Sequence, residues 1–168
     1  MKIRLLFSFI LGLATSLVLV AVPALASETL DNSAALQGIE KTKSVFLIKF
    51  DNASRTDSFM KAIRATHEGL LEQDVRSDMV IVFIEKAVRF LTTEPEATLV
   101  EADGEALQSI AATAKELKTL GVRMEVCGAA TERFGVDNES VLDEMTVVEN
   151  GFISLIGWQS QGHVPMTF

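Results

Sequence analysis

Five predominantly apolar runs of strand length recur along the chain, and the segments between them show helical periodicity. Apolar runs of about four to eight residues are typical of strands that a parallel sheet buries on both faces. The runs cover residues 44–50, 79–84, 122–127, 145–149 and 164–168.

Between these runs, apolar residues return every three or four positions, which predicts helices with one buried face. The apolar faces comprise Phe59, Ile63 and Leu70 in the first long helix, Leu107, Ile110, Ala114 and Leu117 in the second, and Phe152, Leu155, Ile156 and Trp158 in the last. Short helical turns are predicted at 85–93, 129–134 and 137–142.

Capping residues and glycines set the predicted ends of the helices. Ser54 and Asp103 are typical N-cap residues for the first two long helices. Gly121 and Gly135 follow predicted helix ends, where glycine readily adopts the left-handed conformation. Pro165 confines the last strand to an edge of the sheet, because proline cannot donate a ladder hydrogen bond.

Strands that alternate with helices are joined by right-handed crossovers and form a parallel sheet. The order of elements therefore predicts one α/β domain at 43–168, with a three-layer α/β/α, doubly wound, mostly parallel five-stranded sheet. Ligand chemistry in such sheets gathers at the carboxyl ends of the strands. A functional site is therefore expected in the loops at the strand ends, at 51–56, 85–89, 127–133 and 149–152.

Residues 1–26 have the organisation of a signal peptide. Two basic residues precede an uncharged apolar stretch that ends at Ala24-Leu25-Ala26, a small-x-small pattern that signal peptidase recognises. Cleavage predicts an exported, periplasmic protein with no membrane segment, in which residues 27–42 form a polar leader. The alternative is a retained N-terminal anchor, because the apolar stretch approaches the roughly 18–20 residues that span a bilayer.

Charge and residue counts exclude several classes of function. The chain has 15 Lys+Arg against 23 Asp+Glu, a formal net charge of −8, which argues against binding to nucleic acid or to an anionic membrane surface. One cysteine and two histidines are too few for a zinc finger or a histidine-rich metal site. The glycines form no phosphate-binding motif. The sequence therefore predicts no nucleotide cofactor, and the low counts of cysteine and histidine predict no metal.

The single cysteine lies at a position suited to chemistry. Cys127 ends the third predicted strand, and Gly128 allows a tight turn into the next helix. The N–H groups and the dipole at the start of that helix favour a thiolate, with Arg123 and Arg133 as the nearby cations. In an oxidising compartment the thiol has no partner in its own chain. The alternative is that Cys127 is a packing residue, because cysteine is often buried.

Other residues give weaker signals. No catalytic triad can be read, and no motif links His67 or His163 to Cys127. Phe152, Ile156 and Trp158 either pack in the core or form a surface that another subunit covers. Three carboxylates follow predicted strands and are expected at the rim of the sheet or as N-caps: Asp51, Glu85 and Glu149.

The segment around Cys127 resembles the core motif of the DsrE/DsrF-like (DsrEFH) sulfur-relay family. Residues 120–136 read LGVRMEVCGAATERFGV, a Gly-Val strand that ends in Cys and is followed by a short helix closed by Gly and an apolar residue. The downstream order is also similar, with a strand at 146–148, a Gly-started helix at 151–161 and a terminal strand. The resemblance covers roughly residues 43–168, nearly the whole of the predicted mature chain.

This resemblance implies a three-layer α/β fold, a homo-oligomer such as a trimer or hexamer, and a strand-end cysteine that carries persulfide sulfur. By position that cysteine is Cys127, and a protein or a small sulfur compound is its donor or acceptor. The turn after the second strand departs from the family, since it reads Glu85-Lys86-Ala87 where many relatives have a His- or Gly-rich turn. The candidate supporting residues are Gly128, Arg123, Arg133 and Glu85.

Two hypotheses about function follow. The first is an exported sulfur-relay protein, acting as a sulfurtransferase or sulfur carrier, that accepts and transfers sulfane sulfur on Cys127 without a metal or nucleotide. The alternative is a non-catalytic oligomeric binding module in which Cys127 is buried and inert. The accessibility of the native thiol distinguishes them.

Overall fold

A computed structural model describes residues 30–167, in which a compact unit begins at Asn32. The predicted signal peptide at 1–26 lies outside the described residues. None of the helices described between residues 30 and 167 is both long and apolar enough to cross a membrane.

The described residues form one sheet of five parallel strands in the order β4-β3-β2-β1-β5. Every predicted strand is present, and the predicted parallel, doubly wound arrangement is confirmed. The strands are β1 (Lys41–Ile48), β2 (Arg76–Phe83), β3 (Arg123–Cys127), β4 (Thr146–Val148) and β5 (Val164–Thr167).

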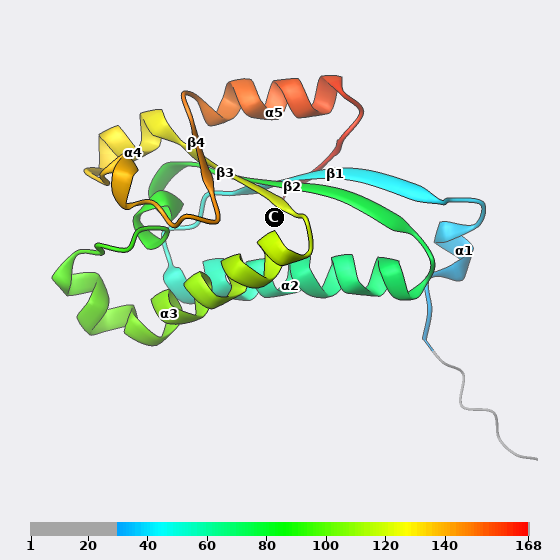
Figure 1. Cartoon of the computed structure of the whole chain (residues 1–168), viewed down its shortest axis with the longest axis horizontal. Coiled ribbons are helices and arrows are strands. Elements are labelled where there is room, and N and C mark those ends of the chain that lie inside the picture. The colour runs from blue at the N-terminus through cyan, green and yellow to red at the C-terminus, as the bar shows by residue number, and fades with distance from the viewer. Residues whose placement is uncertain (1–29, 168) are drawn as a thin grey trace, which may run out of the picture. The chain divides into compact units, whose positions relative to one another are not determined.

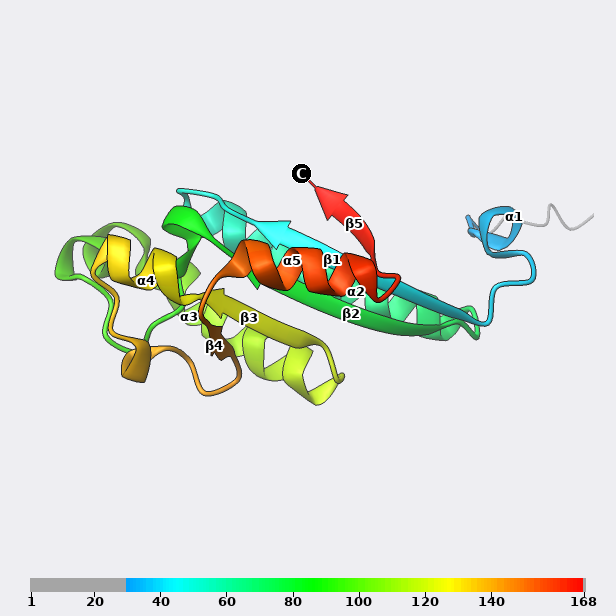
Figure 2. The same cartoon turned by 90° about the horizontal axis from the view of Figure 1, so that it is seen from above.

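Helices cover both faces of the sheet and complete the predicted three layers. Helices α2 and α3 pack side by side on one face, and α5 lies on the other (Figures 1 and 2). The helices are α1 (Ser33–Leu36), α2 (Ala53–Glu72), α3 (Ala97–Thr119), α4 (Gly128–Phe134) and α5 (Gly151–Ser160), with short 3₁₀ helices η1 (Glu85–Phe90) and η2 (Asn138–Ser140).

The core lies between the central strands and the α2–α3 layer. Ile48 of β1 pairs with Phe83 of β2, and both side chains are fully buried. Met60, Ile63 and Ile110 are also fully buried. Burial of each such side chain stabilises the fold by about 1.5–3 kcal/mol, so the strands that carry the site are held by the best-packed part of the molecule.

One predicted helix start is wrong, and another lies at a kink. The N-cap of α2 is Asn52 rather than Ser54, because the Asn52 side chain accepts a hydrogen bond from the Arg55 N–H at 2.8 Å. Helix α3 begins at Ala97, before the predicted cap, and consists of two helical segments joined by a kink at Asp103, whose φ of −131° is non-helical. The predicted start at Asp103 therefore lies at the junction of these two segments rather than at the beginning of α3.

The predicted ends of elements agree better with the structure. Gly121 and Gly135 have φ of +82° and +69°, the left-handed conformation expected after a helix. Strand β5, which contains Pro165, is an edge strand. Val88 and Leu91, in and just after η1, are fully buried as predicted.

Candidate functional site

Cys127 is the last residue of β3 and the N-cap residue of α4. The residue is 4% exposed. Its side chain accepts no capping hydrogen bond from the first turn of α4, and the Ala129 N–H donates instead to the Glu149 carbonyl at 3.1 Å. The sequence predicted that the first N–H groups of α4 would point toward the sulfur. Helix α4 does begin at the cysteine, but none of these N–H groups donates a hydrogen bond to the sulfur.

Two glycines allow the backbone to close around Cys127. A Cβ on Gly128 would lie 3.0 Å from the Val148 carbonyl oxygen. A Cβ on Gly151 would lie 2.6 Å from Ile84 Cγ2 and 3.1 Å from Cys127 Cβ. Glycine at both positions lets β4 and the start of α5 approach the cysteine more closely than any side chain would permit.

The start of α5 contributes polarity to the site. Asn150 caps this helix, and its side chain accepts a hydrogen bond from the Phe152 N–H at 2.9 Å. Since Gly151 lies against Cys127, the positive end of the α5 dipole is adjacent to the thiol. The electrostatic contribution that was predicted for α4 therefore also comes from a second helix, α5.

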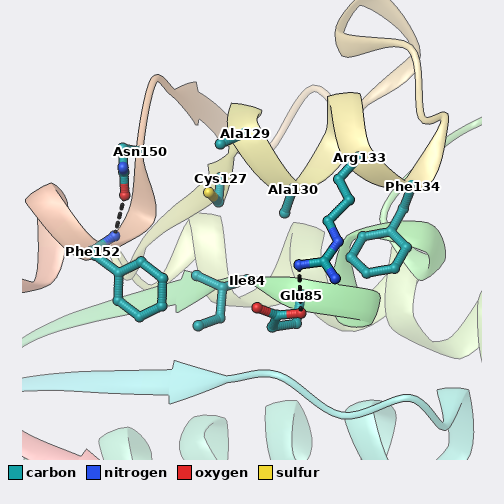
Figure 3. A pocket seen from close by; sticks show the side chains of 9 residues that line it. All are labelled: Ile84, Glu85, Cys127, Ala129, Ala130, Arg133, Phe134, Asn150 and Phe152. Atoms are coloured by element: carbon teal, nitrogen blue, oxygen red, sulfur yellow. Dashed lines mark hydrogen bonds and ion pairs between the residues drawn. The ribbon is translucent and has the colours of Figure 1, made fainter.

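A pocket of about 180 Å³ opens beside Cys127, at the carboxyl ends of β2 and β3. Phe152 lies on one side of the pocket, and Arg133 and Phe134 lie on the other, with Cys127 and Ile84 between them (Figure 3). The position agrees with the rule that ligands bind at the carboxyl ends of parallel strands. The lining residues are Ile84, Glu85, Cys127, Ala129, Ala130, Arg133, Phe134, Asn150 and Phe152.

The two charged residues of the pocket face each other. Arg133 Nη1 lies 3.9 Å from Glu85 Oε2, and the two side chains are 71% and 45% exposed (Figure 3). An ion pair this exposed is worth only about 0–1 kcal/mol, because water and salt screen it. The arginine can therefore exchange its partner for a ligand at little cost.

Glu85 has an unusual backbone conformation. Its φ is +53°, in the left-handed region that costs a residue with a Cβ about 1–2 kcal/mol. The residue begins η1 and is separated from the end of β2 by Ile84 alone. Such outliers concentrate at functional sites, where the surrounding structure holds them in place.

The structure brings together three of the four predicted supporting residues. Glu85 and Arg133 line the pocket, and Gly128 follows the cysteine directly. Arg123 lies at the opposite end of β3, where its guanidinium is 3.9 Å from Glu125 Oε1. A strand advances about 3.3 Å per residue, so Arg123 is outside the pocket.

A buried carboxylate holds α5 on the sheet. Glu125 is 4% exposed and accepts hydrogen bonds from Ser154 Oγ at 2.5 Å and Trp158 Nε1 at 3.0 Å. Hydrogen bonds to a carboxylate are stronger than hydrogen bonds between two neutral groups, and burial strengthens them further. Glu125 is thus a positioning residue for the helix that begins at the pocket.

The structure also separates the apolar residues of α5. Trp158 packs against the core and donates to Glu125. Phe152, Ile153 and Ile156 are 55%, 64% and 66% exposed and form the outer face of this helix. The sequence analysis assigned Trp158 and Ile156 to the same apolar face of this helix, because helical periodicity does not show which of the two is buried.

The histidines and Asp51 have local roles. His67 Nδ1 is 2.6 Å from Ser77 Oγ, and His163 Nδ1 is 3.1 Å from the Trp158 carbonyl oxygen. Asp51 forms an ion pair with Lys86 at 3.7 Å. Within residues 30–167, no three His, Cys, Asp or Glu side chains are arranged to hold a metal ion.

Several pocket residues were not predicted from the sequence. Ile84 and Phe134 were read as apolar residues of a strand and a helix, because periodicity does not show which one lines a cavity. Asn150 and Phe152 lie in the loop at 149–152, one of the loops in which a site was expected, but no role in a pocket was predicted for either residue.

Comparisons with known proteins agree with the fold. Solved structures with similar folds include MTH1491, described as a protein of unknown function, from Methanobacterium thermoautotrophicum, with 20% identity, a TM-score of 0.59, and coverage of 76% of this chain and 99% of that one. The ychN protein from E. coli has 18% identity and a TM-score of 0.53, with coverage of 76% and 99%. BT1422 from Bacteroides thetaiotaomicron, described as a conserved protein of unknown function, has 18% identity and a TM-score of 0.51, with coverage of 77% and 95%.

The family assignment comes from the sequence itself. A search of curated proteins finds no match. The model of the DsrE/DsrF-like family matches residues 42–168, which include every strand from β1 to β5 except the first residue of β1. The chain therefore belongs to the DsrE/DsrF-like family.

Proposed function

We propose that this protein is a sulfur-relay protein that accepts and transfers sulfane sulfur as a persulfide on Cys127. The observation that carries the proposal is the position of Cys127, which lines a pocket formed by the ends of β2 and β3 and the starts of α4 and α5. Membership of the DsrE/DsrF-like family supports the same role.

The proposed chemistry is a displacement at sulfur. The Cys127 thiolate attacks the outer sulfur of a donor persulfide, R–S–SH. A bond forms between Sγ and that sulfur, the donor S–S bond breaks, and R–S⁻ leaves with the electron pair. An acceptor thiolate then attacks the outer sulfur of Cys127–S–SH and releases the Cys127 thiolate. Neither transfer needs an external oxidant or reductant, because only sulfane sulfur moves.

Native reactivity tests this proposal against the inert-cysteine alternative, which the 4% exposure of Cys127 favours. A carrier thiol must react with iodoacetamide and with polysulfide in the folded protein. Polysulfide should add about 32 Da per sulfur atom to the peptide that contains Cys127, and dithiothreitol should remove it. A thiol that reacts only after unfolding would support the binding-module function instead.

Export is part of the proposal. The signal-peptide pattern predicts that the mature chain begins at Ser27 and is periplasmic. Intact-mass analysis of protein recovered from the periplasm should give the mass of residues 27–168. Recovery of the full-length chain from the membrane fraction would instead indicate a retained anchor.

We also propose that the domain is a homo-oligomer that covers the outer face of α5. Phe152, Ile153 and Ile156 expose neighbouring apolar side chains, which a monomer in water would leave hydrated. Light scattering should give a multiple of the monomer mass, and Ile156→Glu should lower that mass. Val100→Glu is the matched control, because Val100 is an equally apolar residue on α3 that is 50% exposed. A monomeric wild-type protein would contradict the proposal.

A further inference from the structure

We infer that the Cys127 pocket takes a small anionic sulfur compound, such as a short inorganic polysulfide, and that Arg133 selects its negative charge. The inference rests on the proposed function, because it names the class of donor that reaches Cys127. It follows from the size of the pocket, the charges of its lining and the position of α5.

The size of the pocket limits the donor. Pockets for drug-sized ligands occupy about 300–1,000 Å³, whereas the pocket beside Cys127 has about 180 Å³. Cys127 itself is 4% exposed, so a donor must enter this space to reach the sulfur. Phe152 and Phe134 border the space from opposite sides, which favours a donor of a few heavy atoms (Figure 3).

The charges of the lining favour an anion. Among the described residues that line the pocket, Arg133 is the one cation and Glu85 the one anion. Their side chains are largely exposed and 3.9 Å apart, so the pair is weak. An anionic ligand can replace Glu85 as the partner of the guanidinium, whose planar donors suit anions. The nearby Lys86 instead pairs with Asp51.

The start of α5 acts in the same direction. Gly151 lies against the Cβ of Cys127, so the positive end of the α5 dipole is next to the residue that carries the sulfur. A thiolate and an anionic donor repel each other, and a positive environment is needed to bring them together. Arg133 and α5 supply that environment from two sides of the cysteine.

The resulting step is balanced without another reagent. The Cys127 thiolate forms a bond with the terminal sulfur of the polysulfide. The bond between that sulfur and its neighbour breaks, and the shortened polysulfide dianion leaves with the electron pair. The product is the Cys127–S–S⁻ anion, which remains in the pocket that Arg133 lines.

Two alkylating reagents of similar size, one charged and one neutral, test the inference. Iodoacetate is an anion and iodoacetamide is neutral, and both release iodide from the same kind of carbon. The measured quantity is the rate constant for iodoacetate divided by that for iodoacetamide at Cys127. This ratio should be roughly two- to fivefold higher in the native protein than in the same chain unfolded in urea. Arg133→Gln should lower the ratio toward the unfolded value, and Glu85→Gln should raise it above that of the wild type.

The control separates a local effect from the overall charge. Arg76 is exposed at the start of β2, far along the strand from the pocket, so Arg76→Gln removes the same charge and should leave the ratio unchanged. Arg133→Gln should also slow uptake of sulfur from inorganic polysulfide by a similar factor. Thermal unfolding should confirm that each variant is folded.

The outcomes distinguish this inference from the proposed function. If native Cys127 reacts with both reagents but Arg133→Gln leaves the ratio unchanged, the charge-selection inference is wrong and the proposed function stands. If native Cys127 reacts with neither reagent, the proposed function is wrong and the inference fails with it.

Discussion

Replacement of Cys127 by alanine is expected to abolish sulfur uptake completely. The chain contains one cysteine, so no other thiol can form a persulfide. After incubation with polysulfide, the wild-type protein should gain multiples of about 32 Da that dithiothreitol removes, and the variant should gain none. Intact-mass spectrometry of both proteins measures the difference directly.

The choice of variant follows from the burial of the cysteine. Because Cys127 is 4% exposed, serine would place a hydroxyl in a site where the sulfur accepts no capping hydrogen bond. An unsatisfied buried hydroxyl costs about 1–3 kcal/mol. Alanine avoids that cost, so a folded Cys127→Ala protein without sulfur uptake isolates the chemistry. A folded wild-type protein that gains no sulfur mass from polysulfide would contradict the proposed function.

Replacement of Gly151 by alanine is expected to lower the free energy of unfolding by about 1–3 kcal/mol. The added Cβ would lie 2.6 Å from Ile84 Cγ2 and 3.1 Å from Cys127 Cβ, distances that force α5 away from the sheet. Movement of α5 also changes the access to Cys127, so the alkylation rate of the native thiol should change in the same variant. Urea unfolding measures the first effect and iodoacetamide kinetics the second.

Gly157 on the same helix is the matched control. A Cβ at this position meets no heavy atom within 4 Å, and alanine is favoured over glycine inside a helix by about 1 kcal/mol. Gly157→Ala should therefore leave the stability unchanged or raise it slightly. If both variants had equal stability, the close approach of α5 to Cys127 would not be a feature of the protein in solution.

The sequence predicted the fold well because buried parallel strands are apolar along their whole length. Residues 79–84 and 122–127 closely match β2 and β3 for this reason. Boundaries set by backbone pairing were harder to predict. Strand β1 begins at Lys41, which pairs with Arg76 of β2, and a ladder between two polar residues leaves no apolar signal.

The candidate site was predicted in part. Cys127 could be identified because a strand, a glycine and a helix follow one another in the sequence. Glu85 and Arg133 could be named from their closeness to strand and helix ends, but their 3.9 Å pairing depends on the left-handed turn at Glu85. The contact between Gly151 and Cys127 joins elements that are adjacent only after the sheet has formed, so no local pattern shows it.

The hydrogen bond from Trp158 to Glu125 gives the protein an internal optical reporter. Trp158 is the one tryptophan of the sequence, and its indole lies edge-on to His163, with ring centroids 5.0 Å apart. Its emission therefore depends on whether α5 is seated on the sheet. The same helix begins at Gly151, which lies against Cys127, so sulfur loading, ligand entry and subunit association can all be followed through the fluorescence of a native residue, without an attached dye.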